Sequence, residues 1–349
     1  MANPGAITLP TPDFTWDPVA RPPIAGLRPY RDTTYRLEPE IVAAKFVVHN
    51  YGHGGAGITL SWGCAQEVVD LVTAHGFAPG DAVAVLGSGV MGMTAAILLS
   101  SLNLNVTIYT RDGPPNTTSN VAGGQWAPSL VNHNDQQKFD RILRRAHATH
   151  AAKGPAYGVS PRLNYTLTHA GNFESCPKDV IPAPEQFNHL PFVHLTAPGF
   201  AYSTLLVEPP IFLPKLRADL TAANVKTKTQ TINNLSEVTS FSEKIIVNCT
   251  GLGSRKICHD QKVRSFRGQL VRLPAQSNLR YLFSGHGGYL FPRQDCVIVG
   301  GSEEPDVYDP APDMRMCEAI LANMKALFEH GLAHMMASEA LPPWAMRSK

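Results

Sequence analysis

The segment from Val83 to Leu99, VAVLGSGVMGMTAAILL, constrains the fold of this chain more than any other stretch. A short apolar run, typical of a buried strand, leads directly into a glycine-rich turn and then into an apolar helical pattern. The turn has the spacing G-x-G-x-x-G, formed by Gly87, Gly89 and Gly92. In such a turn the first glycine permits the sharp bend, the second admits a pyrophosphate, and the third lets helix and strand pack closely. The amides at the helix start, including those of Val90 and Met91, favour bound phosphates.

A second strand-like run, Val106–Thr110, completes a strand–helix–strand unit and favours a dinucleotide site over a purely structural turn. The fingerprint usually has an acidic residue at the end of this strand, where it binds the ribose hydroxyls. Here Thr110 occupies that place and Arg111 follows, so the ribose contact falls to Thr110, Arg111 or Asp112. An arginine there could equally hold the 2′-phosphate of NADP. The fingerprint by itself therefore leaves both FAD and NADP open.

A second glycine-rich segment precedes this unit, NYGHGGAGITLSWG at residues 50–63. It follows a predicted strand, Ile41–Val48, and leads into a helix predicted over about Cys64–Ala74, whose first amides come from about Ile58 to Gly63. A helix start aimed at the pyrimidine end of a flavin would stabilise the negative charge of the reduced ring. This favours FAD over a nicotinamide cofactor. A glycine-rich hairpin packed on another strand is the structural alternative.

Patterning along the rest of the chain predicts an α/β protein of two interleaved parts. Residues 1–26 carry six prolines and predict an extended segment on the surface. Helical patterns occupy 136–152, 212–223 and 314–328, and strand patterns occupy 244–248, 269–273, 289–291 and 296–299. Strands and helices alternate near the front, whereas strands dominate after about residue 265. We therefore predict a Rossmann-like parallel-sheet domain interleaved with an antiparallel-sheet domain.

Composition narrows the class of partner. The 30 Lys and Arg residues against 28 Asp and Glu residues give a net charge of +2, which offers no broad basic surface to nucleic acid. Apolar stretches are too short to span a bilayer, and no signal-peptide pattern is present. The six cysteines lack a CxxC pair and predict reduced, mostly buried thiols. No His or Cys grouping suits a metal, and we interpret His147 and His150 as solvated surface residues.

We expect a cytoplasmic protein. The ending Arg347, Ser348, Lys349 lacks the final Leu of a peroxisomal signal, which leaves the peroxisome as the alternative.

Seven motifs resemble the D-amino-acid oxidases and their D-aspartate, glycine and sarcosine oxidase relatives. They are GLRPYR (Gly26–Arg31), HNYGHGGAGITLSWG (His49–Gly63), VAVLGSGVMG (Val83–Gly92), TTSNVAGGQWAP (Thr117–Pro128), IVNCTG (Ile246–Gly251), RGQLVRL (Arg267–Leu273) and YLFP (Tyr289–Pro292). In the family, the first two motifs lie near the C-terminus, whereas here they precede the dinucleotide fingerprint. The sequence therefore resembles a circularly permuted member of the family, in which the short Phe77–Asp81 loop joins the former ends.

The resemblance implies a substrate site and an FAD site. It implies that Arg28 clamps the substrate carboxylate, for which a planar guanidinium is suited, and that the Tyr289 hydroxyl binds the same carboxylate. The whole candidate substrate set is Arg28, Tyr289, Gly55, Tyr202 and His286. Besides the three fingerprint glycines, the candidate cofactor set is Val90, Met91, Thr110, Arg111, Thr117, Thr118, Gly124, Gln125, Trp126, Ile232, Thr250, Gly251, Gly54, Gly55, Gly57, Ile58 and Thr59. Among these, Gly57, Ile58 and Thr59 are expected at the pyrimidine end of the ring, and Ile232 near the adenine.

One departure from the family affects the substrate. The family's lid tyrosine, four residues before the YLFP tyrosine, is replaced by Gly285 within SGHGGY, and His286 or Tyr202 is expected to fill that space. The resemblance also implies a division into an FAD-binding domain, 37–127 and 206–264, and a substrate domain, 1–36, 128–205 and 265–349. It leaves a homodimer open as the assembly.

The implied activity is oxidation of an amino acid or related carboxylated amine by FAD. Hydride would pass from Cα to flavin N5, dioxygen would reoxidise the flavin to give hydrogen peroxide, and the imine would hydrolyse to a keto acid. Two alternatives remain at this stage. One is an NADP-dependent reductase that uses Arg111. The other is a flavoprotein tailoring enzyme or binding protein that has lost the oxidase activity.

Overall fold

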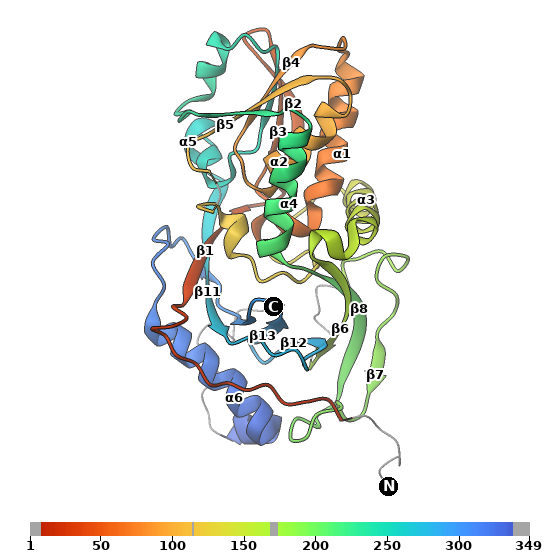
Figure 1. Cartoon of the computed structure of the whole chain (residues 1–349), viewed down its shortest axis with the longest axis vertical. Coiled ribbons are helices and arrows are strands. Elements are labelled where there is room, and N and C mark those ends of the chain that lie inside the picture. Colours follow the sequence, from red (N-terminus) through yellow and green to blue (C-terminus); the bar gives the residue numbers. More distant parts are fainter. Residues whose placement is uncertain (1–7, 114, 168–173, 338–349) are drawn as a thin grey trace.

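Two β-sheets organise the chain (Figure 1). The computed structural model describes residues 8–113, 115–167 and 174–337, and the ending Arg347–Lys349, which was compared with a peroxisomal signal, lies outside this part of the chain. One sheet has six strands and the other nine. The predicted α/β class with a parallel and a largely antiparallel sheet is confirmed.

The six-stranded sheet is parallel except at one edge, where β2 runs antiparallel to β3. In spatial order its strands are β2 (Arg36–Val42), β3 (Lys45–Tyr51), β10 (Ile245–Asn248), β4 (Ala82–Leu86), β5 (Asn105–Thr110) and β9 (Lys226–Thr229). Alternate residues of β4, a strand inside this sheet, are buried on opposite faces, so both faces of the sheet are covered. Val83 and Val85 pack with the helices on one face, whereas Ala84 and Leu86 pack with Ile232, Val238 and Ile257 on the other.

The nine-stranded sheet contains the strands that were predicted after residue 265, together with strands from three other parts of the chain. Its order is β1 (Ile24–Arg31), β11 (Val263–Leu273), β14 (Val297–Gly300), β13 (Gly288–Pro292), β12 (Tyr281–Gly285), β6 (Val159–Thr166), β8 (Gly199–Val207) and β7 (Glu185–Phe187), and β15 (Glu304–Pro305) pairs with β11. Its neighbouring strands are antiparallel except β6 and β12, which run parallel.

Six α-helices and several short 3₁₀ turns surround these sheets in the described part of the chain. The helices are α1 (Gly57–His75), α2 (Val90–Ser100), α3 (Gln136–Lys153), α4 (Pro209–Ala222), α5 (Ser254–Ile257) and α6 (Met314–Ala337), the last broken at Gly331. The 3₁₀ turns are η1 (Gly54–Ala56), η2 (Thr118–Val121), η3 (Gly154–Tyr157), η4 (Leu235–Ser240) and η5 (Gly251–Gly253).

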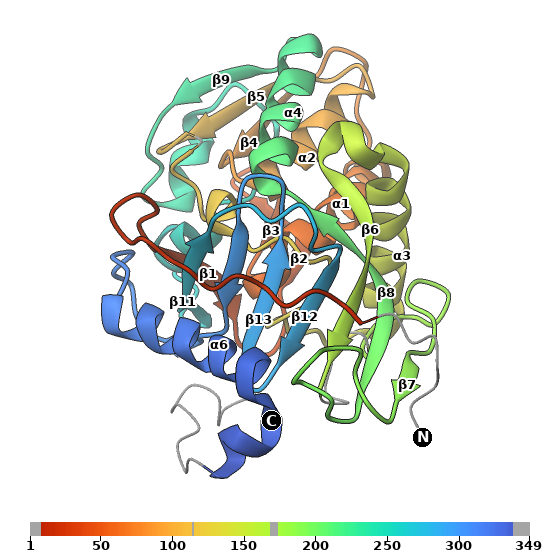
Figure 2. The same ribbon diagram turned by 60° about the horizontal axis from the view of Figure 1, so that its bottom comes forward.

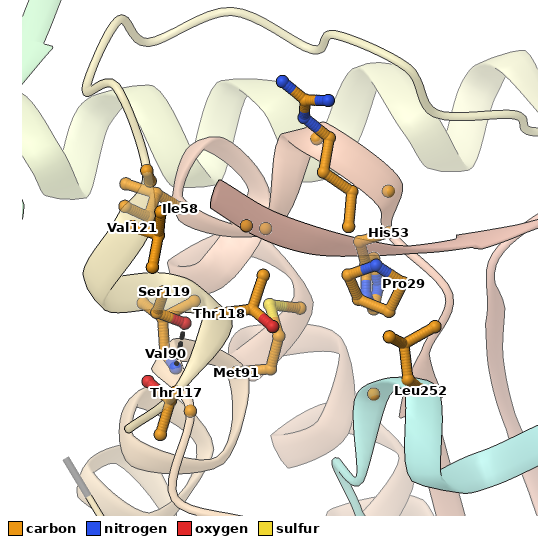
Figure 3. A pocket seen from close by; sticks show the side chains of 18 of the residues that line it. Pro29, His53, Ile58, Val90, Met91, Thr117, Thr118, Ser119, Val121 and Leu252 are labelled. Carbon is orange, nitrogen blue, oxygen red and sulfur yellow. Dashed lines mark hydrogen bonds between the residues drawn. The ribbon is translucent and has the colours of Figure 1, made fainter. Parts of the chain in front are cut away.

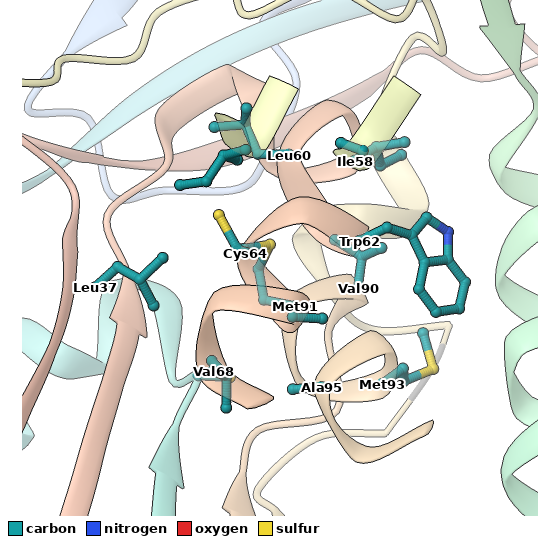
Figure 4. Close-up of a cluster of buried hydrophobic side chains, with 14 of the residues drawn as sticks. Leu37, Ile58, Leu60, Trp62, Cys64, Val68, Val90, Met91, Met93 and Ala95 are labelled. Carbon is teal, nitrogen blue, oxygen red and sulfur yellow. The ribbon is translucent and has the colours of Figure 1, made fainter. Parts of the chain in front are cut away.

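Packing of α1 on α2 forms the centre of the larger core (Figure 4). Leu60, Cys64 and Val68 of α1 are fully buried, and Met93 and Ala95 of α2 are buried in the same cluster. α3 also packs on α1, although residues 128–205 were expected to belong to the substrate part. The cysteine prediction is confirmed: all six are free, and five of them are buried.

The described part of the N-terminal segment has no helix or strand before β1 and lies along α6 on the nine-stranded sheet (Figure 2). The prolines predicted an extended surface segment here. Phe14 is buried there, with its ring centroid 5.9 Å from that of Phe328. Pro10 and Asp13 are fixed by side chains of the sheet region, because the Tyr281 hydroxyl donates to Pro10 O at 2.7 Å and Gln276 Nε2 donates to Asp13 O at 2.8 Å.

Three local predictions are wrong. The predicted strand Ile41–Val48 is a hairpin, because Ala43 and Ala44 take φ values of 44° and 67° between β2 and β3. The helix start predicted at about Cys64 is wrong, because α1 begins at Gly57; this agrees with the prediction that the first amides of the helix come from about Ile58 to Gly63. His150 is fully buried rather than solvated, and its Nδ1 lies 2.9 Å from Ala146 O; His147 packs edge-on against Trp126 with centroids 4.9 Å apart.

Candidate functional site

A cavity of about 840 Å³ lies between the two sheets and is lined by residues of both. The carboxyl ends of β3, β10, β4 and β5 border it on one side, and strands β1, β11, β13 and β12 border it on the other. In Figure 3, Val90, Met91, Thr117 and Ser119 gather at one side of this cavity, and Pro29, His53 and Leu252 lie at the other. Ligand sites outside the carboxyl ends of parallel strands are the rule in such sheets.

The fingerprint turn has the geometry that its glycines predict. Gly87 takes a φ of 101°, which favours glycine, and its N–H donates to Tyr109 O at 2.7 Å. A Cβ on Gly92 would lie 1.9 Å from Gly87 O, so this position allows the close approach of α2 and β4. Gly89 begins α2 without a side-chain cap, and a Cβ there would find its nearest atom, Ser119 Oγ, at 3.5 Å. The start of α2 therefore faces the cavity over an open glycine.

The end of β5 replaces the usual acidic residue with hydroxyls and an ion pair. Thr110 Oγ1 lies 2.9 Å from Ser88 Oγ and donates to Asp112 O at 2.7 Å. Arg111 Nε donates to an Asp112 carboxylate oxygen at 2.6 Å, and both side chains are exposed at the cavity. The Arg111 charge thus already has an anionic partner, which disfavours a second anion such as a 2′-phosphate.

The loop that follows β5 closes over the start of α2. Ser119 Oγ accepts from the Val90 N–H at 3.0 Å, the bond drawn in Figure 3. Thr117, Thr118, Gly124 and Gln125 line the cavity as expected. Trp126 does not: it is completely buried, its backbone N–H donates to Leu205 O at 2.8 Å, and its ring packs in the core.

The upstream glycine-rich segment forms the η1 turn and the beginning of α1 at the cavity wall. Gly54, Gly55, Gly57, Ile58 and Thr59 all line the cavity. The Thr59 hydroxyl is fixed because it donates to Ala127 O at 2.8 Å and accepts from the Ala127 N–H at 3.1 Å. α1 has no side-chain cap at its N-terminus, so its positive dipole end faces the cavity directly.

The end of the cavity beside the nine-stranded sheet contains Arg28. Its guanidinium lies across Gly268, where a Cβ would be 2.2 Å from Nη2, and its Nη1 donates to Ser302 O at 3.2 Å. Tyr289 lies over Gly300, where a Cβ would be 2.5 Å from the hydroxyl oxygen. Burial raises the pKa of the Tyr289 phenol, although a hydrogen bond with Arg28 and its positive charge oppose the shift. The phenol therefore stays protonated beside the guanidinium.

A tight hairpin takes the place of the expected lid. Gly285 pairs with Gly288, and the turn between them consists of His286 and Gly287 with φ values of 50° and 73°, as type I′ turns require. His286 lines the cavity, and burial lowers its pKa. Asn323 Nδ2 of α6 donates to His286 O at 3.0 Å and holds the turn. Across the cavity, Gln125 Nε2 donates to the Tyr202 hydroxyl at 3.0 Å.

The structure thus brings nearly all the candidate residues to one cavity. The five substrate candidates line it, as do Ile232, Thr250 and Gly251 and every other cofactor candidate except Gly92 and Trp126. Sequence reasoning missed Ser119, Ser302 and Glu303. Ser119 lies within the TTSNVAGG motif and was passed over. Ser302 and Glu303 reach the site through their position after β14, for which no local pattern gives a signal.

A protein-family model described as FAD dependent oxidoreductase matches residues 82–348, which is most of the chain. This chain belongs to the FAD-dependent oxidoreductase family. The match decides between the two cofactors left open by the fingerprint, in favour of FAD and against the NADP alternative. The matched range begins where β4 begins, so β1, β3 and α1 lie outside it.

Several proteins are similar in sequence. D-aspartate oxidase of Homo sapiens is 29% identical over 283 residues, covering 75% of this chain and 81% of the relative. D-amino acid oxidase of Dugesia ryukyuensis is 28% identical and covers 70% of this chain and 77% of the relative. Among solved structures, glycine oxidase from Bacillus cereus superposes with a TM-score of 0.53 at 15% identity, covering 74% of this chain and 79% of that one. L-proline dehydrogenase from P. horikoshii superposes with a TM-score of 0.52 at 14% identity, covering 74% of this chain and 79% of that one. These superpositions confirm the fold.

The residues at the cavity fit FAD. An open glycine precedes the start of α2, where Ser119 Oγ already accepts from the Val90 N–H. The uncapped start of α1 faces the same space, and the cavity continues between the two sheets to Arg28. The protein is accordingly an FAD-dependent oxidoreductase. Within the described ranges, no helix combines the length and the apolar character that crossing a membrane requires.

Proposed function

We propose that this enzyme is an FAD-dependent oxidase of an amino acid or a related carboxylated amine, with dioxygen as the electron acceptor. Arg28 carries the proposal, because it presents a guanidinium, fixed by a backbone carbonyl and beside the Tyr289 phenol, to the cavity. A carboxylate is the group that such a planar donor pair binds best. The names of the sequence relatives, D-aspartate oxidase and D-amino acid oxidase, support a carboxylated amine as substrate.

Bound FAD would supply a two-electron acceptor, which takes hydride from the substrate carbon and returns the electrons to dioxygen to give hydrogen peroxide. The chain's own part is to bind and orient. Arg28 and Tyr289 would hold the carboxylate at one end, since the Tyr289 O–H can donate while Arg28 neutralises the charge. The two helix starts would stabilise negative charge on the cofactor.

We assign the cofactor side to Gly87, Gly89, Val90, Met91, Thr110, Arg111, Thr117, Thr118, Gly124, Gln125, Ile232, Thr250, Gly251, Gly54, Gly57, Ile58 and Thr59, and the substrate side to Arg28, Gly55, Tyr202, His286 and Tyr289. The lining of the cavity supports this assignment. Gly55 adjoins both Arg28 and Ser129, because a Cβ there would lie 3.5 Å from Arg28 Cδ and 2.9 Å from Ser129 O. The division into an FAD-binding part, 37–127 and 206–264, and a substrate part is likewise proposed, with α3 as the exception because it packs on α1.

The test is anaerobic reduction of the bound flavin by a panel of D- and L-amino acids and amines. A carboxylated amine should bleach the yellow enzyme under nitrogen, and Arg28→Ala should lose that bleaching at low substrate concentration while the flavin stays bound. Arg28→Lys should recover part of the affinity, because it restores the charge without the planar donor pair. A yellow enzyme that no panel member bleaches would favour the tailoring-enzyme or binding-protein alternative. Bleaching that Arg28→Ala leaves unchanged would refute the carboxylate clamp.

A further inference from the structure

The charges that line the cavity are unevenly placed. Among the described residues they are Arg28, Arg111, Asp112, Lys256 and Glu303. Arg111 and Asp112 pair with each other after β5, and Lys256 on α5 donates to Asn233 Oδ1 at 2.9 Å, so these three lie on the dinucleotide side. Arg28 and Glu303 remain at the substrate end. One cation and one anion therefore face a substrate there.

The backbone around Glu303 is fixed against both the hairpin and Arg28. A Cβ on Gly301 would lie 2.2 Å from Gly287 O, so the chain leaving β14 touches the turn that borders the cavity. Ser302 O accepts from Arg28 Nη1, and Ser302 Oγ accepts from the Gln269 N–H at 2.8 Å. Glu303 thus follows directly a residue that holds the proposed carboxylate clamp.

The Glu303 carboxylate differs from that of its neighbour. Glu304 is bound by Arg267 at 2.7 Å and by Gln269 Nε2 at 2.8 Å. Glu303 is exposed at the cavity, and no ion pair or hydrogen bond of its carboxylate is found within residues 8–113, 115–167 and 174–337. Its negative charge reaches the substrate end, where it contributes to the raised pKa of Tyr289.

We infer that Glu303 is a specificity-determining residue that selects substrates with a cationic side chain and rejects those with an acidic one. The inference rests on the proposed function, since Arg28 must hold the α-carboxylate. A cationic group at the far end of the substrate would then meet the carboxylate of Glu303. A second carboxylate would meet that negative charge and would find no second cation, because Arg28 is already used. The preference would thus run opposite to that implied by the name of the human relative, D-aspartate oxidase.

The experiment compares matched substrates on the flavin-loaded enzyme. The kcat/KM values for arginine, its neutral analogue citrulline, glutamine and glutamate are measured, each as the D- and the L-enantiomer. The wild type should prefer arginine to citrulline and glutamine to glutamate. Because Glu303 is exposed, we expect Glu303→Gln to reduce each preference by about fivefold, and to change the kcat/KM for citrulline less than that for arginine. The preference should also weaken as salt is added.

Glu318→Gln is the matched control, because it removes an exposed carboxylate from α6 that does not line the cavity. It should leave all ratios unchanged. If neutral amino acids are oxidised and Glu303→Gln changes neither ratio, the specificity inference is overturned while the oxidase proposal stands. If no amino acid reduces the flavin, the proposed function itself fails. A wild type that prefers glutamate to glutamine overturns the inference without the variant.

Discussion

The guanidinium of Arg28 lies directly against the backbone of Gly268, across the pairing of β1 with β11. A Cβ at that position would be 2.2 Å from Nη2 and 2.4 Å from Cζ of Arg28, so any side chain on Gly268 must displace the guanidinium. The arginine of one strand and the glycine of its partner therefore form one unit. Neither residue could be recognised as half of a pair from its own sequence neighbourhood.

Gly268→Ala should consequently act as a mild form of Arg28→Ala. We expect KM for an amino acid substrate to rise by about tenfold, as for the loss of one well-placed charged hydrogen bond, while flavin binding is retained. Steady-state kinetics with peroxide detection and the flavin spectrum would measure both. Gly113→Ala is the control for the general effect of replacing glycine, because nothing lies within 4 Å of a Cβ there. An unchanged KM in Gly268→Ala would mean that Arg28 does not bind the substrate.

The fingerprint glycines should separate folding from cofactor binding. Gly92→Ala forces a methyl group to within 1.9 Å of Gly87 O, so it should destabilise the protein even without flavin, by about 1–3 kcal/mol or more. Gly89→Ala meets only Ser119 Oγ at 3.5 Å and should leave the apoprotein intact. Gly89→Ala should nevertheless weaken the binding of FAD, because the methyl group occupies the space through which the pyrophosphate approaches the start of α2.

Thermal unfolding of the two variants as apoproteins, followed by titration with FAD, would measure both effects. The expected pattern is a lowered midpoint in Gly92→Ala, and an unchanged apo midpoint with a smaller FAD-induced rise in Gly89→Ala. If FAD raises the thermal midpoint of Gly89→Ala as much as that of the wild type, the cofactor phosphates do not bind at the start of α2.

Burial of His150 should make the fold sensitive to acid. Burial lowers the pKa of His150 from 6.5 to about 4. Between these values the unfolded chain binds a proton that the folded chain does not, so stability is complete above pH 6.5 and falls as the pH drops towards 4. The slope for this one group is roughly 1.4 kcal/mol per pH unit. Chemical denaturation at several pH values should show that the free energy of unfolding falls less steeply with decreasing pH in His150→Gln than in the wild type. His194→Gln, at an exposed position, serves as the control. Equal slopes in all three proteins would show that His150 is not responsible.

A structural feature could be predicted from the sequence where the residues that determine it are adjacent in the chain. The β4–turn–α2 unit was predicted because its strand, glycines and helix are adjacent in the chain. The β2–β3 hairpin was missed because Ala43 and Ala44 carry no turn signal, although both adopt left-handed conformations. The family resemblance implied that Trp126 lies at the cofactor, but the side chain is buried in the core. Ser302 and Glu303 reach the site only through the pairing of β14 with β11 and β13, which no nearby residue specifies.

The order of the motifs yields a further prediction. We propose that the chain is circularly permuted relative to its family, and two observations support this. The family match begins at residue 82, and β1 and β3 nevertheless pair with β11 and β10 of the matched region. The α1–β4 connection should then be the former pair of chain ends. Its residues 76–81 are mostly exposed, and α1 ends at Gly76 with a φ of 92°.

A variant opened between Ala78 and Pro79, with Lys349 joined to Met1, should therefore fold and bind FAD. Phe14 and Phe328 already pack together, so the two ends are joined directly, without an added linker. Because chain ends are tolerated where the backbone is exposed and few contacts cross, we expect a thermal midpoint within about 5 °C of the wild type. A control opened between Leu86 and Gly87 should not bind FAD, since it cuts the phosphate-binding turn. If opening at Ala78 is as damaging as opening at Leu86, the α1–β4 connection is integral to the fold and the proposed permutation loses its support.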